Sequence, residues 1–472
     1  MQDVDVSPRP SDQFESVLPE PAWREWRAAV ERSVRVLDGR TVWNVNATAR
    51  GGGVAEMLWS LIAYARGVGV DTRWLVLDGN APFFRVTKRI HNLLHGSTGD
   101  GLGLSGQDRD VYLAESRRAA AALAERTRPG DIVLLHDPQT AGITAHLPAD
   151  RIVVWRSHIG MDAPNDHARA GWAFLAEFLP RAAAYVFTRR SYAPPELAPA
   201  KLVEIPPSID AFSPKNQFLT PDAVRAILAA ARLVDGSGGG SALPGFVRTD
   251  GSLGLVSRHA ELAGPPPPAS APLVVQVSRW DRLKDPVGVV RAFADHVAPV
   301  VPAAHLVYAG PATAAVSDDP EGAEVLAETR RAWAGLPPAV RSRVHLAALP
   351  MEDPGENAAI VNALQRHAAV VAQKSIAEGF GLTVAEAMWK SRPVVASAVG
   401  GIRDQIQDGV SGLLVGDPTD LAAFGAAVCR LLGDPAEASR MGATGRERVR
   451  TLFLSSRHLM QYEALFGGLL GA

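Results

Sequence analysis

Two cations follow a strongly apolar strand candidate in the second half of the chain. The segment Ser278-Arg-Trp-Asp-Arg-Leu-Lys284 continues from residues 273–278, which are mostly apolar. Ligands of open α/β sheets bind at the carboxyl ends of the strands. There Arg279 can donate two parallel hydrogen bonds to phosphate oxygens, and Lys284 can supply a point charge. The pair suits a diphosphate, and the alternative interpretation is a solvated basic turn.

A second segment encloses two glycines between two glutamates. Glu378-Gly-Phe-Gly-Leu-Thr-Val-Ala-Glu386 follows the strand candidate 369–373 and opens a helix. The glycines let backbone amides face an anion, and the N-terminus of the helix adds a favourable dipole. Glu386 lies over a turn into this helix, where a carboxylate can accept hydrogen bonds from ribose hydroxyls. The alternative is a capped helix with one exposed glutamate.

The first half of the chain contributes a glycine turn. Asn44-Val-Asn46 is followed by Gly51-Gly52-Gly53 and then by a helical pattern. Such a turn lets backbone amides approach a phosphate or a sugar, although a loop that only needs positive φ angles has the same composition. The nicotinamide fingerprint G-x-G-x-x-G fails because Glu56 stands at its last glycine position.

A histidine ends the fourth strand candidate of the first half, in Trp155-Arg-Ser-His158. His158 can hydrogen-bond a sugar hydroxyl or polarise the forming bond, and a structural histidine at a strand end is the alternative. No metal site is predicted. Asp3-Val-Asp5 and Asp108-Arg-Asp110 match D-x-D, but neither follows a buried strand, and both are interpreted as solvated loops.

The elements that must position these side chains alternate between short apolar runs and helical patterns, which predicts parallel strands crossed by helices. The strand candidates are residues 41–46, 72–77, 131–136, 151–156, 183–188, 273–278, 305–309, 344–349, 369–373 and 393–398. The predicted fold is α/β, with two Rossmann-like, doubly wound domains facing across a cleft and C-terminal helices bracing them.

The predicted domains are a partly helical N-terminal extension, a first and a second Rossmann-like domain and a C-terminal helix, at residues 1–40, 41–205, 206–455 and 456–472. Residues 235–272 are rich in glycine, serine and proline, which predicts a flexible surface insertion in the second domain.

Global composition excludes several classes of protein. A net charge of -2 gives no indication of nucleic-acid binding, and the single cysteine, Cys429, excludes disulfides. The N-terminus lacks a secretory signal, and the apolar runs are too short to span a bilayer, for which about 20 residues are needed. We therefore expect a cytoplasmic enzyme without an integral membrane segment.

With these motifs in place, the chain resembles retaining glycosyltransferase family four, which has the GT-B architecture, and more narrowly the glycosyltransferring trehalose synthases. The resemblance spans about residues 41–450. The matching stretches are Asn44–Thr48, Gly51–Glu56, Phe83–Asn92, His136–Gln139, Pro206–Asp210, Gln276–Arg279, Asp318–Gly322 and Ser375–Lys390.

The resemblance implies a nucleotide-glucose donor (ADP-, UDP- or GDP-glucose), a glucose acceptor and α,α-trehalose as the product, with no cofactor besides this co-substrate. A homodimer is considered as the oligomeric state. Arg279 and Lys284 would grip the diphosphate, Glu378 the donor glucose and Glu386 the ribose, while His158 would face the donor sugar across the cleft. The remaining implied residues are Gly52, Gly53, Phe380, Gly381 and Leu382 on the donor and Asn46 and Lys88 on the acceptor.

The chain departs from the family pattern at three places. The family has an acidic residue directly after the isoleucine that follows the histidine, whereas here the nearest acid after His158 is Asp162. Arg282-Leu283 replaces the aromatic segment that the family has before the lysine. Residues 235–272 are an insertion that the family pattern lacks. The alternatives are a retaining trehalose phosphorylase, a family-four enzyme with another acceptor and a non-catalytic sugar-nucleotide binding module. A nicotinamide oxidoreductase ranks last.

Overall fold

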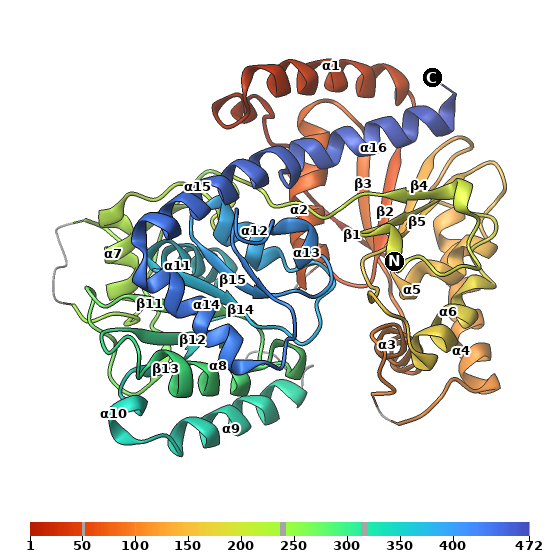
Figure 1. The fold of residues 1–472 in the computed structure, drawn as a ribbon. Helices are drawn as coiled ribbons and strands as arrows, with labels where there is room; N and C mark the ends of the chain where they lie inside the picture. The colour runs from red at the N-terminus through yellow and green to blue at the C-terminus, as the bar shows by residue number, and fades with distance from the viewer. Residues whose placement is uncertain (50–51, 100, 237–241, 313–319, 472) are drawn as a thin grey trace. The chain divides into compact units, whose positions relative to one another are not determined.

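The computed structural model describes residues 1–49, 52–99, 101–236, 242–312 and 320–471. The chain divides into two compact units, of which unit 1 comprises Met1–Ser208 with Phe453–Ala472 and unit 2 comprises Ile209–Leu452. Each unit has its own seven-stranded sheet (Figure 1).

Unit 1 is built on strands in the order β1-β3-β2-β4-β5-β6-β7. The edge strand β1 is antiparallel to β3, and all other neighbours are parallel. The strands are β1 (Gln2–Val4), β2 (Val42–Asn46), β3 (Thr72–Val76), β4 (Ile132–His136), β5 (Ile152–Ser157), β6 (Ala184–Phe187) and β7 (Leu202–Glu204). The helices are α1 (Glu20–Val36), α2 (Gly52–Gly67), α3 (Ala81–Leu94), α4 (Gly106–Ala124), α5 (Pro138–Ala141), α6 (Asp166–Ala176) and α16 (Ser455–Leu470).

Strand β4 explains why this sheet is covered on both faces. Successive side chains of a strand point to opposite faces. Val133 and Leu135 belong to one apolar cluster, whereas Ile132 and Leu134 belong to another, together with side chains of α16. Figure 1 shows α16 lying beside α1, with which it is in contact. The direction of the crossovers changes between β2 and β4, the place where doubly wound sheets bind ligands.

Unit 2 has the strand order β10-β13-β12-β11-β14-β15-β16. Its parallel strands are β11 (Leu273–Val277), β12 (His305–Pro311), β13 (Val344–Leu349), β14 (Val370–Gln373), β15 (Val394–Ser397) and β16 (Leu413–Val415). The helices are α7 (Pro221–Ala230), α8 (Pro286–Ala292), α9 (Pro320–Ala334), α10 (Pro338–Arg341), α11 (Pro354–His367), α12 (Leu382–Trp389), α13 (Ile402–Gln405), α14 (Leu421–Gly433) and α15 (Pro435–Leu452). This is the Rossmann order 3-2-1-4-5-6, with its switch point between β11 and β14.

Residues 235–272 hold more regular structure than their composition predicts. β8 (Gly245–Val247) pairs with β9 (Leu253–Leu255), and β10 (Glu261–Ala263) adds an antiparallel edge to β13. The ion pair between Arg248 and Asp353 ties the segment to the start of α11. The glycines at 237–241 lie outside the described residues.

The α/β class and the two doubly wound sheets are confirmed, and every predicted strand is present. The short edge strands β1, β7, β10 and β16 were not predicted, because three residues carry too little periodicity. The interpretation of 3–5 and 108–110 as solvated loops was wrong. Asp3 lies in the edge strand β1 and forms an ion pair with Arg126 at 2.6 Å. Asp108 lies in the first turn of α4, where it forms a capping box with Ser105 and an ion pair with Arg89. That the C-terminal helices brace the domains stays a prediction.

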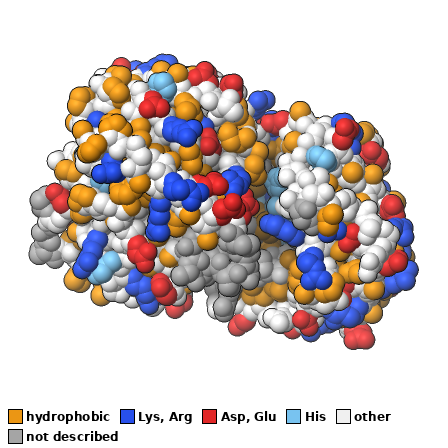
Figure 2. Space-filling model, turned by 90° about the horizontal axis from the view of Figure 1, so that it is seen from below, with side chains coloured by type: hydrophobic (Ala, Val, Ile, Leu, Met, Phe, Trp, Pro, Cys, Tyr) orange, Lys and Arg blue, Asp and Glu red, His pale blue; other side chains and the backbone are white. Residues whose placement is uncertain are grey.

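Two surface properties are relevant to partners. Among the described residues, no helix is long and apolar enough to cross a bilayer. Figure 2 shows basic and acidic side chains interspersed with apolar ones over the face that it draws, rather than collected into one broad basic area.

Candidate functional site

The loop after β11 is held firmly at the carboxyl edge of the sheet of unit 2. The Trp280 side chain is buried, stacks on Tyr308 at a centroid distance of 5.0 Å and donates a hydrogen bond to the Pro311 carbonyl at 2.8 Å. Asp281 caps the short helix η5 (Arg282–Lys284) by accepting the amide hydrogen of Leu283 at 2.8 Å. The loop therefore offers Arg279 and Lys284 from a fixed backbone.

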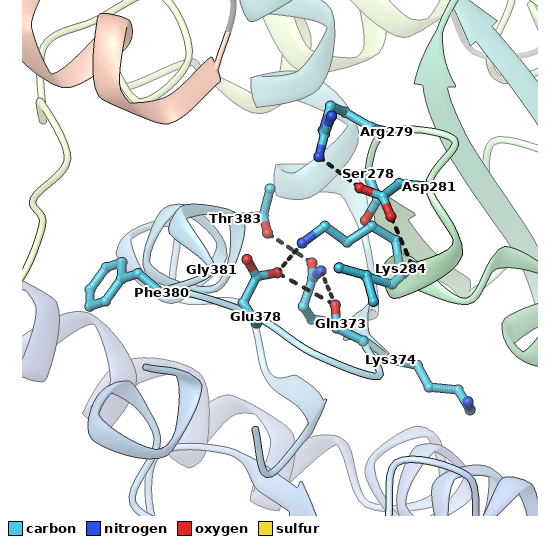
Figure 3. A network of polar contacts seen from close by, with 12 residues as sticks. Ser278, Arg279, Asp281, Lys284, Gln373, Lys374, Glu378, Phe380, Gly381 and Thr383 are labelled. Carbon is cyan, nitrogen blue, oxygen red and sulfur yellow. Dashed lines mark hydrogen bonds and ion pairs between the residues drawn. The ribbon is translucent and has the colours of Figure 1, made fainter. Parts of the chain in front are cut away.

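The structure brings Lys284 together with Glu378, as Figure 3 shows. The Lys284 Nζ lies 2.5 Å from Glu378 Oε2, and the two side chains are only 16% and 13% exposed. Arg279 comes from the same loop, is 63% exposed and forms an ion pair with Asp281 at 2.7 Å. Two cations, each paired with a carboxylate, thus stand at the switch point between β11 and β14.

A polar network supports this cluster from the strand ends. The Thr383 hydroxyl donates to Gln373 Oε1 at 2.8 Å, and Gln373 Nε2 donates to the Ser375 hydroxyl at 3.0 Å. Gln276 links the two loops, because its Nε2 donates to the Lys284 carbonyl at 2.9 Å and its Oε1 accepts the amide hydrogen of Lys374 at 2.9 Å. Both loops are therefore fixed relative to each other.

The turn before α12 needs its glycine for conformational reasons. Gly381 has a φ of 84°, in the left-handed region, and Leu382 is the first residue of the helix. Gln405 Nε2 donates to the carbonyls of Phe380 at 2.5 Å and of Gly381 at 3.3 Å, which fixes the orientation of these peptides. Figure 3 shows the Phe380 ring pointing away from Lys284 and Glu378.

Glu386 is buried, which the sequence did not predict. Its side chain is 3% exposed. Its Oε1 lies 3.7 Å from the Lys215 Nζ, and its Oε2 is buried without a hydrogen-bond partner among the described residues. A buried carboxylate oxygen without a donor is costly, by about 1–3 kcal/mol or more. The alternative of an exposed glutamate on a capped helix is therefore wrong.

A buried lysine lies one turn further along α12. Lys390 Nζ donates to Asn216 Oδ1 at 2.9 Å, to Gln365 Oε1 at 2.8 Å and to the Glu386 carbonyl at 3.1 Å. Burial lowers the pKa of Lys390 well below its usual range, and the nearby Glu386 charge opposes that shift. Lys390 therefore holds the C-terminal turn of α12 against the segment that contains Lys215 and Asn216.

Of the predicted residues of unit 1, His158 lies in a polar cluster where β4 and β5 end. His136 Nδ1 and His158 Nε2 are 3.1 Å apart, and His136 Nε2 lies 3.4 Å from Asn44 Oδ1. Burial, reinforced by the Arg156 charge, lowers the pKa of His136 to about 3, and the same causes lower the pKa of His158 well below its usual value. Both rings are therefore neutral near pH 7.

Asp137 lies directly beside His158, in a backbone conformation that non-glycine residues rarely adopt. Its φ is 65°, and its carboxylate accepts the backbone amide hydrogen of His158 at 2.7 Å. Burial raises the pKa of Asp137 to about 7, although this hydrogen bond and the Arg156 charge favour the ionised form. Strained residues concentrate at functional sites, which makes Asp137 a candidate.

Arg156 is a fully buried cation behind these residues. It donates to His458 Nε2 at 2.8 Å, to the Tyr462 hydroxyl at 2.6 Å and to the Ile205 carbonyl at 3.0 Å. Because a guanidinium only donates, His458 accepts through Nε2 and is the neutral tautomer with its hydrogen on Nδ1, which lies 2.9 Å from the Ser208 hydroxyl. Arg156 thus joins β5 to α16 and to the segment that follows β7.

The other predicted residues of unit 1 do not join this cluster through any hydrogen bond of the described residues. Asn46 is buried and fully engaged, because Trp74 donates to its Oδ1 at 2.8 Å and its Nδ2 donates to the Thr48 carbonyl at 2.6 Å. Lys88 is exposed on α3. Gly52 has a φ of 78° and Gly53 is exposed, both in the first turn of α2; Gly51 lies outside the described residues.

Sequence reasoning assigned no role to several residues that the structure places in these clusters. Among them are Asp137 and His136 in unit 1 and Gln373 and Lys215 in unit 2. His136 and Asp137 were visible as part of a stretch that matches the family, and Gln373 was visible as the last residue of a strand candidate. Lys215 carried no signal, because it meets Glu386 only in the folded chain.

Two Rossmann-like sheets, together with a match to the model of glycosyl transferases group 1, define a glycosyltransferase of GT-B type. The solved α,α-trehalose-phosphate synthase (UDP-forming) from Burkholderia xenovorans in complex with glucose-6-phosphate is similar with a TM-score of 0.64 and 16% identity, covering 92% of this chain and all of that one. This likeness concerns the fold. The model of the trehalose synthase N-terminal domain matches residues 44–194, and that of glycosyl transferases group 1 matches residues 354–448.

The chain belongs to the trehalose synthase family of glycosyltransferases. It is 37% identical to the trehalose synthase of Rubrobacter xylanophilus over 95% of each chain. It is 34% identical to that of Pyrococcus horikoshii over 98% of this chain and 97% of the relative. The chain is thus an enzyme of trehalose-related glycosyl transfer.

Proposed function

We propose that the enzyme transfers glucose from a nucleotide-glucose to free glucose and forms α,α-trehalose with retention of the anomeric configuration. The observation that carries the proposal is the arrangement in unit 2: a Lys284–Glu378 pair at the switch point, with the partnerless oxygen of Glu386 further along α12. A nucleoside diphosphate sugar offers a diphosphate, sugar hydroxyls and ribose hydroxyls to these groups. The membership of the trehalose synthase family supports the product.

Donor binding would replace contacts that the protein now makes with itself. The diphosphate would take Lys284 and the exposed Arg279 as counter-charges. Glu378, released from Lys284, would accept hydrogen bonds from hydroxyls of the donor glucose. Ribose hydroxyls would donate to Glu386 Oε2 and so satisfy a group that has no partner among the described residues.

The reaction would follow a front-face course. A hydroxyl of the acceptor attacks the anomeric carbon on the side from which the diphosphate leaves. The bond between that carbon and the phosphate oxygen breaks, and the acceptor proton passes to the departing oxygen. Negative charge grows on the diphosphate, and Arg279 and Lys284 would stabilise it from fixed positions, the kind of electrostatic term that commonly dominates catalysis.

Unit 1 would serve the acceptor. Its neutral histidines, His136 and His158, and the carboxyl group of Asp137 suit an uncharged sugar, whose hydroxyls both donate and accept hydrogen bonds. The similar Burkholderia xenovorans protein is described as UDP-forming and was solved with glucose-6-phosphate, which supports a nucleotide leaving group and a glucose-type acceptor.

The direct test is product formation from ADP-, UDP- and GDP-glucose with glucose as the acceptor. We expect at least one donor to give a disaccharide whose two anomeric protons both show α coupling by NMR. If none of the three yields trehalose, the proposal is wrong. Cleavage of trehalose that requires inorganic phosphate and no nucleotide would identify a phosphorylase instead.

The residue assignments are tested by thermal shift with nucleoside diphosphates, because a ligand that binds only the folded state raises the melting temperature. We expect Arg279→Ala and Glu386→Gln to lose most of the shift. Arg282→Ala is the matched control, because Arg282 lies on the same loop but pairs with Glu328 at 2.8 Å. If both test variants keep the full shift, the donor-site map is wrong.

A further inference from the structure

A buried ion pair adjoins the loop that carries Lys284. The Lys374 side chain is 1% exposed, and its ammonium donates a hydrogen bond to the Asp285 carboxylate. Asp285 directly follows Lys284 in the chain, and Lys374 directly follows the end of β14. Figure 3 shows the Lys374 side chain leading away from Lys284 and Glu378. The pair is therefore a connection between the two loops that is separate from the Lys284–Glu378 pair.

Asp285 has a backbone conformation that residues other than glycine rarely adopt. Its φ of 46° and ψ of 54° lie in the left-handed region. Besides its pair with Lys374, the carboxylate accepts the backbone amide hydrogen of Gly288 at 3.0 Å and so caps α8. A strained backbone persists only where the surrounding contacts hold it. These two contacts therefore fix the turn that directly follows Lys284.

Lys374 connects further segments at the same edge of the sheet. Its ammonium also donates to the Pro418 carbonyl at 2.8 Å, in the segment after β16. Two residues further on, the Ile376 amide donates to the Leu283 carbonyl at 2.8 Å. A buried ammonium is costly unless it is paired and hydrogen-bonded, so a lysine at this position needs a carboxylate partner. The ion pair and the backbone contact together hold the chain on both sides of Lys284.

We propose that Asp285 and Lys374 are positioning residues, which hold Lys284 in place for the diphosphate of the donor. This inference rests on the proposed function and concerns the same site. The present partner of Lys284 is Glu378, and donor binding would release that contact. From then on, the backbone on either side of Lys284 determines where its ammonium stands.

The position of the Lys284 ammonium matters because of the way in which lysine acts. Lysine is a point charge on a flexible four-carbon stem, without the rigid fork of arginine. A cation stabilises the charge that develops in a transition state best when it is held in place beforehand. A misplacement of about 1 Å can lower a rate roughly 100-fold. A fixed backbone at residues 283–285 limits the positions that are open to this ammonium.

The first experiment compares Asp285→Asn with the matched variant Asp353→Asn. Asp353 caps α11 as Asp285 caps α8, and it also pairs with a basic residue of another segment, Arg248. Asparagine keeps an oxygen for the cap and tolerates the left-handed conformation, but it lacks the charge that pairs with Lys374. We expect both variants to lose stability in chemical denaturation, and only Asp285→Asn to lose kcat, by roughly 10- to 100-fold.

Charge alone predicts the opposite result for Asp285→Asn. The substitution removes a negative charge beside the anion site, which by electrostatics alone would strengthen the binding of a diphosphate. A loss of kcat therefore reports a displaced Lys284. Lys374→Met breaks the pair from the other side and should lower kcat at least as much. Wild-type kcat in a folded Asp285→Asn overturns the inference and leaves the proposed function intact.

The second experiment is a double-mutant cycle, which measures whether Asp285 acts through Lys284. In a Lys284→Ala background, Asp285→Asn should lower kcat by no more than about twofold, because the ammonium to be positioned is absent. A further loss as large as that in the wild-type background overturns the inference, because it would indicate a general structural role.

Binding measurements separate a failure of this inference from a failure of the proposed function. If the wild type turns over no nucleotide-glucose, the proposed function is wrong, and calorimetry with ADP, UDP and GDP decides the inference. A Kd that Asp285→Asn raises in the wild-type background, but not in the Lys284→Ala background, supports it. Equal Kd values in all four proteins, or a wild type that binds none of the three nucleotides, overturn it.

Discussion

The polar clusters of the two units differ in whether their side chains are charged. In unit 2, Lys284 and Glu378 stay ion-paired at the edge of the sheet, and Arg279 reaches solvent. In unit 1, His136 and His158 are kept neutral, and burial raises the pKa of Asp137 to about 7. Both clusters stand at the carboxyl ends of parallel strands, so the difference arises from side-chain burial and not from topology.

This contrast shows how one architecture can serve two kinds of ligand. Under the proposed function, the preformed Lys284–Glu378 pair would exchange partners on donor binding, because a diphosphate would compensate the lysine charge and sugar hydroxyls would donate to the glutamate. Neutral imidazoles avoid the penalty of a second buried cation beside Arg156 and can donate to or accept from a sugar hydroxyl. If the comparison holds, substitutions in unit 2 will remove charge stabilisation, whereas substitutions in unit 1 will remove hydrogen bonds to sugars.

The largest effect is expected from Lys284→Ala. Loss of this cation removes charge stabilisation that is needed mainly in the transition state, so kcat should fall by roughly 10²–10³-fold. Arg282→Ala changes a cation two residues away that pairs with Glu328 and Glu324, and it should stay within about twofold of the wild type. Steady-state kinetics with the best nucleotide-glucose measures both. Equal losses in the two variants would remove Lys284 from the site.

His158→Ala tests the other side of the comparison. The loss of one hydrogen bond to the reacting sugars should lower kcat/KM by roughly 10- to 100-fold. His167→Ala, an exposed histidine of α6, is the control and should be neutral. Because the His158 ring is already neutral near pH 7, kcat/KM of the wild type should show no histidine titration between pH 6 and 8. Because the pKa of Asp137 is about 7, the profile is also measured in Asp137→Asn, and a titration in this range that persists in that variant would contradict the assignment.

Asn46→Ala distinguishes a structural role from an acceptor-binding one. The substitution leaves the buried indole N–H of Trp74 without its acceptor, which should lower stability by about 1–3 kcal/mol. Chemical denaturation measures this loss. At a temperature where the variant is folded, the KM for the acceptor should stay near that of the wild type. A raised acceptor KM at unchanged stability would instead support the role that the resemblance implied.

The smallest effect concerns Asp137. A carboxyl group whose pKa is raised from 3.8 to about 7 in the folded state binds more protons there than in the unfolded chain. Its contribution to stability is therefore greatest below about pH 4 and declines as the pH rises to 7. Relative to Asp137→Asn, the wild type should lose about 2 kcal/mol between pH 5 and 7, which is measured as a fall in Tm. Parallel Tm profiles of the two proteins would show that this carboxyl group is ionised throughout.

Much of the fold followed from local patterns. The apolar runs that became β2, β4, β11 and β14 are long enough, and bounded clearly enough by polar segments, to be recognised one by one. The edge strand β10 was not recognised, because it lies in a segment of glycine and proline and gains its regularity only by pairing with β13. Composition described that segment as a loop, whereas pairing made part of it a strand.

The candidate site divides in the same way. The types and spacing of residues 278–284 and 378–386, together with the strands before them, were sufficient for the sequence to predict an anion site at the end of two strands. What only the tertiary structure decided is which groups meet. Lys284 and Glu378 are 94 residues apart along the chain, and Lys215 approaches Glu386 from another segment. Burial, which leaves one oxygen of Glu386 without a partner and holds His158 neutral, depends on side chains from many elements at once, and no local pattern records it.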